Sequence, residues 1–272
     1  MPDTAANLAE FPKPGSGENS PFPQARVVAL SECGAHAVVA AAIGCVEDGE
    51  RQLAEEVLHA FAPGMLVLAD RGFYSYRLWR EVLATGAQAA FRVAKTVHLP
   101  VLEVLPDGSY LSEVHLPNVG KARIDADRVE DVRLATHARV RVVEYTVDTT
   151  DKTKTRELFR VITSVLDPDE LHAMEIVYAY KERWELELSF REIECQIRPS
   201  GATLRSKSPA MVRQEIWGLL IAHYAIRAFM VEAADTIDID PDRISMTRAI
   251  NIIHRSVTDP AAFPPSPETD TI

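Results

Sequence analysis

Near the start of the chain, apolar residues first occur in short continuous runs and then recur at helical spacing. Apolar runs over 25–30 and 37–43 are too short for helices and are separated by a turn at Gly34, so they predict an antiparallel hairpin. Neither run alternates cleanly, which is typical of strands buried on both faces. From 50 to 61 apolar residues recur every three to four positions, and this spacing predicts a helix.

The next segment repeats the order of strand, helix and strand. The apolar run 65–69 predicts a buried strand, and Pro and Gly residues separate it from the preceding helix. A helical pattern over 75–84 ends at Gly86, and an apolar run over 89–93 predicts a second strand. This order indicates an α/β fold.

Short strands and turns dominate the middle of the chain, from about 96 to 163. They predict an all-β insertion within the α/β fold. The expected strands are 101–105, 122–124, 129–134, 139–148 and 158–163.

Two long helical patterns follow the β-rich segment. The first begins at Pro168, with acidic residues in its first turn, and is expected to run from 167 to 197 as one helix. The second covers 209–233. The expected domains are an irregular loop at 1–24, an α/β domain at 25–95 and 164–234, the β-rich insertion at 96–163, and a partly disordered tail at 235–272 with a short helix at 246–254.

Charge and composition narrow the classes of function. The formal net charge of -11 excludes a protein that coats nucleic acid through an overall basic surface, so any DNA contact must come from a local patch. The three cysteines are widely spaced, which indicates neither a disulfide framework nor a zinc site. No secretory signal is visible, and the apolar run 216–231 contains His223 and Arg227, so we expect a core helix, no membrane association and a cytoplasmic location.

Two carboxylates far apart in the sequence are candidates for chemistry. Asp70 follows the buried strand 65–69, at the end where open α/β sheets bind ligands. It could instead cap the helix that begins near Ser75 or pair with Arg71. Glu187 lies within the predicted helix 167–197. Together they suggest a metal site.

The helix that carries Glu187 is expected to present a polar stripe. Tyr180, Arg183, Glu187 and Glu194 recur at spacings of three, four and seven residues, which places them on one side of a continuous helix. The alternative is an ordinary solvated face with ion pairs such as Arg183 with Glu187.

The motifs around these residues resemble the insertion-sequence transposases of the DDE superfamily, in the branch named after insertion sequence four. Tyr180, Arg183 and Glu187 have the spacing of the Tyr-Arg-Glu part of that family's signature, and 68–73 is similar to its second aspartate motif. The segment from 20 to 34 also resembles family members. The similarity covers nearly the whole chain.

The resemblance implies a ribonuclease-H-like α/β fold, in which a mixed sheet is flanked by helices, and a DNA strand cleavage and transfer activity. It implies two Mg²⁺ ions held by two aspartates and a glutamate, with Asp70 and Glu187 as the second and third metal ligands and catalytic residues. Tyr180 and Arg183 are the implied DNA contacts, at phosphates near the transposon end.

Two departures from the family pattern bear on activity. A lysine is expected seven residues after the glutamate, where this chain has Glu194. The family's first aspartate, in an Asp-Gly-Thr sequence on an opening strand, has no counterpart near Asp3, so Met1 is interpreted as an internal methionine of a longer frame. We therefore expect an N-terminally truncated form that is inactive alone and lacks a central strand.

Further candidates flank these motifs. Arg198, Arg205, Lys207 and Arg213 form the densest basic cluster, which is either a DNA-backbone contact or a solvated interhelical turn. A chain without the third carboxylate could be a DNA-binding or dimerising remnant that modulates an intact transposase. It could also be a nuclease that uses Glu194 as a substitute ligand. The expected partners are transposon-end DNA and a second copy or an intact transposase.

Overall fold

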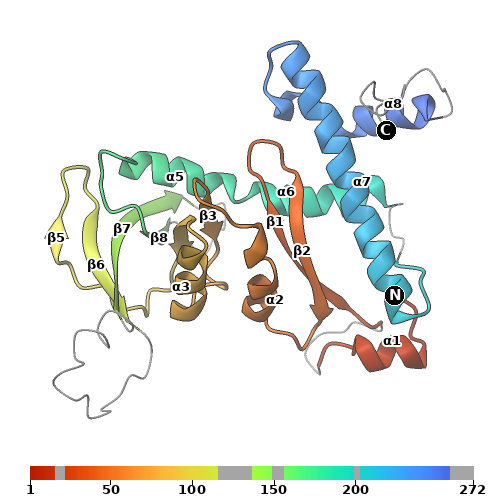
Figure 1. The fold of residues 1–272 in the computed structure, drawn as a ribbon, viewed down its shortest axis with the longest axis horizontal. Coiled ribbons are helices and arrows are strands. Elements are labelled where there is room, and N and C mark those ends of the chain that lie inside the picture. Colours follow the sequence, from red (N-terminus) through yellow and green to blue (C-terminus); the bar gives the residue numbers. More distant parts are fainter. Residues whose placement is uncertain (16–21, 116–136, 149–155, 199–202, 258–272) are drawn as a thin grey trace, which may run out of the picture. The chain divides into compact units, whose positions relative to one another are not determined.

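The computed structural model describes residues 1–15, 22–115, 137–148, 156–198 and 203–257 (Figure 1). The chain divides into two compact units. We call residues 26–29 and 40–184 the sheet unit, and residues 1–25, 30–39 and 185–272 the helical unit. The predicted hairpin is formed by β1 (Ala25–Ser31) and β2 (Val38–Cys45), and its turn belongs to the helical unit. It forms a two-stranded sheet, and Val28 is the one buried residue of β1, so the expected burial on both faces was wrong for this strand.

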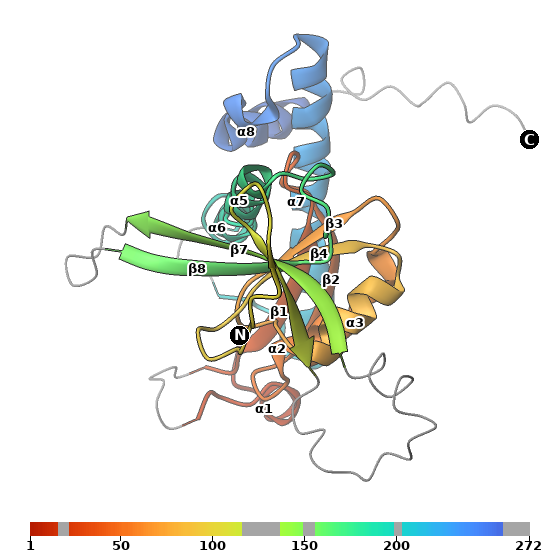
Figure 2. The ribbon, with the colours of Figure 1, turned by 90° about the vertical axis from the view of Figure 1, so that its left-hand side faces the viewer.

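A six-stranded mixed sheet forms the centre of the sheet unit, in the order β3-β4-β8-β7-β6-β5. Strands β3 and β4 are parallel, and every other pair is antiparallel. Figure 2 shows β7 and β8 as long curved strands. The strands are β3 (Leu66–Ala69), β4 (Gln88–Arg92), β5 (Glu103–Val104), β6 (Tyr110–His115), β7 (His137–Asp148) and β8 (Arg156–Thr163).

The strands from the middle of the chain continue the same sheet as β3 and β4. Ala90, Phe91 and Arg92 of β4 pair with Thr163, Ile162 and Val161 of β8. The expected β-rich insertion therefore does not form a sheet of its own in the described residues. The reason is a pairing between strands more than sixty residues apart, which local patterns do not reveal. The strands expected at 122–124 and 129–134 lie outside the described residues.

Helices cover both faces of the sheet. Apolar residues of α2 (Glu50–Glu56) and α3 (Tyr76–Ala84) pack with Ala89 and Phe91 on one face, and a short 3₁₀ turn, η1 (Leu58–Ala60), follows α2. On the other face, α5 (Ala173–Glu182) packs against Ala90. Alternate residues of β4 thus enter opposite cores, which explains why this strand is apolar on both sides.

Local signals set the limits of α3 as the sequence predicted. The Ser75 hydroxyl accepts a hydrogen bond from the Leu78 N–H at 3.1 Å, which caps the first turn. Gly86 follows the helix with φ of 88°, a left-handed conformation that favours glycine. Trp79 is fully buried and meets the edge of Phe91 with ring centroids 5.3 Å apart. This pair anchors α3 to the sheet.

A buried ion pair attaches the start of α5 to β7 and to the turn between β5 and β6. The Arg141 side chain in β7 is fully buried and donates hydrogen bonds to Asp107, to Ser109 Oγ at 2.7 Å and to the Leu171 carbonyl at 2.6 Å. Asp107 also accepts from the Ala173 N–H at 2.9 Å, in the first turn of α5. The pair therefore fixes both the β5–β6 turn and the beginning of α5.

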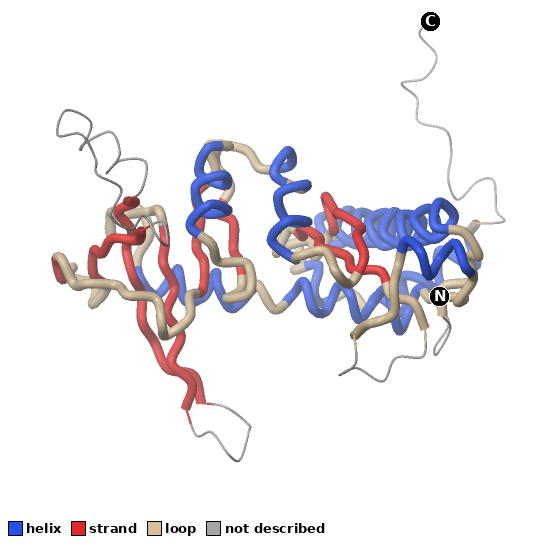
Figure 3. Tube along the Cα trace, turned by 90° about the horizontal axis from the view of Figure 1, so that it is seen from below, coloured by secondary structure: helices blue, strands red, loops and turns tan. Residues whose placement is uncertain are grey.

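The described part of the helical unit consists mainly of helices (Figure 3). The longest, α7, packs its Ile226 and Met230 against Met246 of α8. The short helix expected at 246–254 is confirmed as α8, and 258–272 lie outside the described residues. The helices are α1 (Ala5–Glu10), α6 (Glu185–Glu192), the π-helix η3 (Ile193–Ile197), α7 (Pro209–Thr236), the 3₁₀-helix η4 (Pro241–Arg243) and α8 (Met246–Ser256).

Two expectations about local structure were wrong. The segment 1–24, expected to be irregular, contains α1, which is capped by Thr4 and followed by the fully buried Phe11. The helix expected to run from 167 to 197 begins only at Ala173, after the cap residue His172. It is also interrupted at Arg183 and Trp184, where the backbone N–H groups bond three residues back, from Arg183 N to Tyr180 O at 3.3 Å and from Trp184 N to Lys181 O at 3.1 Å. Neither glycine nor proline marks this break, and the two units divide immediately after it.

By length and composition alone, α7 could cross a membrane. Its expected role as a core helix holds for one face only. His223 and Arg227 on that face are buried, and both contact Glu192 of α6.

Replacing Trp79 by alanine tests whether the Trp79–Phe91 contact anchors α3. We expect Trp79→Ala to lower the free energy of unfolding by about 3–5 kcal/mol, because it leaves a large cavity in the core. Trp184→Ala is the matched control: Trp184 is 53% exposed, so its loss should change stability by no more than about 0.5 kcal/mol. Urea denaturation followed by circular dichroism measures both, and equal effects would contradict the packing described.

Asp107 should make the stability of the sheet unit depend on acidic pH. Burial opposes ionisation, but hydrogen bonds from Ser109 and Ala173 and the Arg141 charge outweigh it and lower the Asp107 pKa from 3.8 to about 2. Because the pKa is lower in the folded state, the stabilisation is complete above the unfolded-state value and is lost as pH falls from 3.8 towards about 2.

The variant Asp107→Asn should lack this acid-dependent component. It should also lower stability at neutral pH by about 3–5 kcal/mol, since Arg141 would remain buried without a counter-charge. Unfolding curves recorded between neutral and acidic pH measure both effects. Asp169→Asn, at an exposed position nearby, serves as control, and identical pH profiles for the two variants would rule out this role for Asp107.

Candidate active site

Asp70 lies where the sequence placed it, directly after β3 and beside the end of the parallel strand β4. Its carbonyl accepts a hydrogen bond from the Phe73 N–H at 3.0 Å, which starts a turn towards α3. The α3 cap is Ser75, so Asp70 does not have the capping role considered as an alternative. Its side chain is 41% exposed and can accept an external ligand.

Tyr180 brings α5 to the carboxylate of Asp70. Its hydroxyl lies 3.3 Å from Asp70 Oδ1 and 3.4 Å from the Ala69 carbonyl, and the residue is only 3% exposed. Burial, followed by the negative charge of Asp70, raises the Tyr180 pKa well above its ordinary value. Tyr180 is therefore a hydrogen-bond donor to the aspartate. Two motifs 110 residues apart in the sequence meet here, in one unit.

Arg92 is a site residue that the sequence reasoning missed. It is the last residue of β4, and its Nη1 lies 3.8 Å from Asp70 Oδ1. Its guanidinium stacks 3.8 Å above the Phe159 ring and donates to Glu157 Oε1 at 2.5 Å. Its position at the end of a strand could have identified it, because the carboxyl ends of adjacent parallel strands lie at the same edge of a sheet.

These contacts define a compact group that we call the Asp70 cluster: Asp70, Arg92, Glu157, Phe159 and Tyr180. Its aromatic part continues to Tyr145, which stacks on Phe159 with centroids 5.3 Å apart. Burial raises the pKa of Tyr145 to about 12, so its hydroxyl stays protonated at neutral pH. The cluster thus combines an accessible carboxylate with a largely buried cation on an aromatic surface.

Arg183 lies at the edge of this group. Its guanidinium carbon is 5.7 Å from the Tyr180 ring centroid, within the range of a cation–π contact. The residue is partly exposed and belongs to the sheet unit. A planar guanidinium at this position can bind an anionic group such as a phosphate.

Glu187 belongs to the helical unit, on α6, and its side chain is exposed. The expected stripe from Tyr180 through Arg183 and Glu187 to Glu194 does not lie on one continuous helix, because the helix is interrupted at 183–184. Glu194 is exposed and lies in the π-helix η3. Asp70 and Glu187 are in different units, so each carboxylate is fixed by the contacts of its own unit.

A buried polar clamp holds the opposite side of α6. Ser189 Oγ donates to the His36 carbonyl at 3.0 Å, and Arg227 Nε donates to Glu192 Oε2 at 3.1 Å. His223 Nε2 lies 2.9 Å from the same Glu192 oxygen. Around the helix, Ser189 lies about 160° and Glu192 about 140° from Glu187, so the clamp points inward while Glu187 points outward.

Charge stabilises this clamp. Burial opposes the ionisation of Glu192, but hydrogen bonds from His223 and Arg227 and the Arg227 charge lower its pKa below the ordinary value. His223, in the run expected to be a core helix, is completely buried beside Glu192. Its partner Glu192 lies more than thirty residues away, so no local pattern indicated this contact.

The basic residues proposed for DNA binding belong to the helical unit. Arg205 and Lys207 are exposed, and Arg198 is partly exposed. Glu215 accepts hydrogen bonds from the backbone N–H groups of Arg205 and Ser206, both at 3.0 Å, so this basic segment is ordered against α7. The loop 199–202 between them lies outside the described residues.

Within the described residues, no three His, Cys, Asp or Glu side chains converge on a point where they could hold a metal ion. Asp70 is nevertheless suited to bind one, because it is an accessible oxygen ligand at the end of a strand. Glu187 has the same donor chemistry and is exposed. The donor atoms therefore fit Mg²⁺, which often takes only one or two carboxylates in addition to water and phosphate oxygens.

Comparison with known proteins agrees with the motifs. Residues 6–225 match the family model described as "Transposase DDE domain". The chain is also 28% identical over 270 residues to "Transposase InsG for insertion sequence element IS4" of Escherichia coli (strain K12). This match covers 93% of the chain and 55% of the relative, so the chain spans about half the relative's length.

The fold and the match over most of the chain define its class as a DDE-domain transposase. The chain belongs to the transposase DDE domain family, and it is similar to a transposase of insertion sequence element IS4. The resemblance noted from Tyr180, Arg183, Glu187 and the Asp70 strand end is confirmed.

Proposed function

We propose that this chain takes part in metal-dependent cleavage and transfer of DNA strands, with a ribonuclease-H-like arrangement of its sheet and helices. The observation that carries the proposal is the hydrogen bond between Tyr180 and Asp70, at 3.3 Å. It joins the tyrosine of the family signature to the aspartate at the strand end. The Asp70 carboxylate is 41% exposed and lies 3.8 Å from Arg92 Nη1, so it is accessible to an external ligand beside a cationic side chain.

In this proposal Asp70 and Glu187 would be the protein ligands of Mg²⁺. The bound ion would supply activation of a water or a 3′-hydroxyl and stabilisation of the leaving oxygen in an in-line phosphoryl transfer. Tyr180 orients Asp70 through its hydroxyl, because its raised pKa keeps the proton on the tyrosine. The accessible side of the aspartate is then left for the ligand.

Arg92 and Arg183 supply positive charge to the DNA backbone in this proposal. Arg92 lies 3.8 Å from Asp70 and is held flat against Phe159, so little side-chain freedom is lost when it contacts a phosphate. Arg198, Arg205 and Lys207 extend the contact along the backbone. Local cations are needed because the whole chain carries a net charge of -11.

A second candidate function is DNA binding without cleavage. It is favoured by the absence, among the described residues, of three converging metal ligands. Asp70 and Glu187 account for two of the three carboxylates that the family resemblance implies. We therefore expect residues 1–272 alone to bind DNA but not to nick a supercoiled plasmid in Mg²⁺, and Mg²⁺-dependent nicking that Glu187→Gln abolishes would favour the enzyme instead.

Metal binding tests the two proposed ligands directly. Asp70→Asn and Glu187→Gln should each weaken Mg²⁺ binding at least about tenfold in isothermal titration calorimetry, because each removes a negatively charged oxygen ligand. Asp238→Asn is the control, since it removes an exposed carboxylate of the unit that carries Glu187 and should leave the affinity unchanged. Equal affinities for wild type and Glu187→Gln would exclude Glu187 as a ligand.

The salt dependence of DNA binding tests the basic segment. If Arg205 and Lys207 each neutralise a phosphate, Arg205→Gln and Lys207→Gln should each reduce the slope of log K against log salt by about 0.9 for duplex DNA. Fluorescence anisotropy with a labelled duplex measures this slope. Arg248→Gln, an exposed arginine on α8 of the same unit, should leave it unchanged, and an equal reduction there would indicate a general charge effect.

A further inference from the structure

One face of α7 is apolar and exposed. The buried face carries Val212, Ile216, Leu220, His223, Ile226, Arg227, Met230 and Ala234. On the opposite face, Trp217 is 41% exposed, Ile221 is 64% exposed and Tyr224 is 49% exposed. These three residues recur at spacings of four and three, so they form one stripe along the helix. A stripe of large apolar residues in water marks a surface for association.

The buried side of α7 argues against a lipid environment for the helix. Arg227, in the middle of its apolar stretch, donates to Glu192, and His223 lies beside the same carboxylate. Ionised groups at the centre of a bilayer are costly. The helix is instead attached to α6 through these groups, and its outer stripe remains to be covered by protein.

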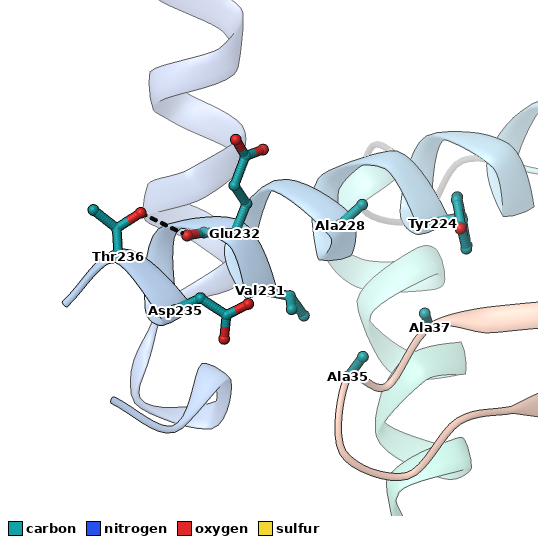
Figure 4. Close-up of a pocket in the computed structure, with 8 residues that line it drawn as sticks. All are labelled: Ala35, Ala37, Tyr224, Ala228, Val231, Glu232, Asp235 and Thr236. Carbon is teal, nitrogen blue, oxygen red and sulfur yellow. Dashed lines mark hydrogen bonds between the residues drawn. The ribbon is translucent and has the colours of Figure 1, made fainter. Parts of the chain in front are cut away.

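An open groove continues the stripe towards the C-terminal end of α7 (Figure 4). It has a volume of about 620 Å³. Its walls are Ala35 and Ala37 of the hairpin turn and Tyr224, Ala228 and Val231 of α7, and its far end carries Glu232, Asp235 and Thr236. Large side chains therefore lie along the N-terminal half of the stripe, and a groove with small side chains lies beside the C-terminal half.

The two ends of α7 also carry opposite charges. The N-terminal end has exposed Arg205 and Lys207 before the helix, and Arg213 in its first turns keeps 39% of its side chain exposed while bonded to Glu10. The C-terminal end has Glu232 and Asp235. In an antiparallel pair of such helices, the basic end of each faces the acidic end of the other.

We propose that the outer face of α7 is an interface between two copies of this chain, packed antiparallel about a twofold axis. Size and charge support the same arrangement. We place Trp217 of one copy in the groove at Ala228 of the other. In this antiparallel register the numbers of any two facing residues add to 445, so Arg213 faces Glu232. A twofold pair forms each contact twice and closes on itself.

Disruption of the stripe tests the interface. The wild-type chain should have twice the monomer mass in sedimentation equilibrium, whereas Ile221→Glu should shift it to the monomer. Val104→Glu is the matched control, because Val104 is 71% exposed in the sheet unit and should not affect the mass. Circular dichroism verifies the fold of both variants. A wild-type monomer, or a dimer that persists in Ile221→Glu, would overturn the proposal.

Charge exchange tests the direction of packing. Glu232→Arg should weaken the dimer, since it places two arginines opposite each other, and adding Arg213→Glu to it should restore the dimer. No recovery in the double variant would reject this register. Binding of the wild-type chain to phosphatidylcholine vesicles, with no dimer in their absence, would show that lipid covers the stripe instead.

Cross-linking distinguishes antiparallel from parallel packing without altering the large apolar residues. In a background with Cys33, Cys45 and Cys195 replaced by serine, Gln214→Cys and Val231→Cys chains should form an intermolecular disulfide only when mixed. Two copies of Gln214 would be about 25 Å apart along the axis in the proposed register, too far for a disulfide. Cross-linking of either variant with itself would overturn the antiparallel arrangement.

Discussion

The buried pair of Arg141 and Asp107 is the contact on which the sheet unit depends. Arg141 is fully buried, and its cost is offset only because its Nε, Nη1 and Nη2 groups all find acceptors. The same carboxylate accepts from the Ala173 N–H, so the pair fixes the beginning of α5 as well as the β5–β6 turn. Two helical turns later, α5 brings Tyr180 to Asp70. The position of Tyr180 at the strand end therefore depends on a buried ion pair at the beginning of the same helix.

The helical unit uses the same kind of contact for its own carboxylate. Glu187 is on a helix whose inner side is held by Ser189 and by Glu192, and Glu192 is bound to Arg227. Buried ion pairs give less stability than good apolar packing, but their geometry is strict because every donor needs an acceptor. Such contacts suit helices that must hold a carboxylate in one orientation. Apolar contacts alone would allow a helix to slide or rotate at lower cost.

Sequence reasoning succeeded where the determining signals are local. The Ser75 cap and Gly86 mark the limits of α3, and the apolar runs on either side identify β3 and β4. The pairing of β4 with β8 was missed because its partners are far apart in the sequence. Arg92 and Arg141 were missed for a related reason: a charged residue in a strand normally indicates a solvent-facing position, and only the fold shows that both are buried. The break at Arg183 and Trp184 has no glycine or proline to reveal it.

The cations near the start of α7 link the proposed DNA contact to the proposed dimer. Arg205 and Lys207 are candidates for phosphate binding and also lie just before α7, at the end that would face the acidic C-terminal end of α7 in a second copy. A charge that neutralises a phosphate cannot fully neutralise a carboxylate as well, and coupling between two binding equilibria is reciprocal. If both proposals hold, DNA bound at this segment weakens the electrostatic part of the dimer, and the apolar stripe around Ile221 must supply the rest. The self-association of a chain with a net charge of -11 would then depend on apolar burial more than on charge.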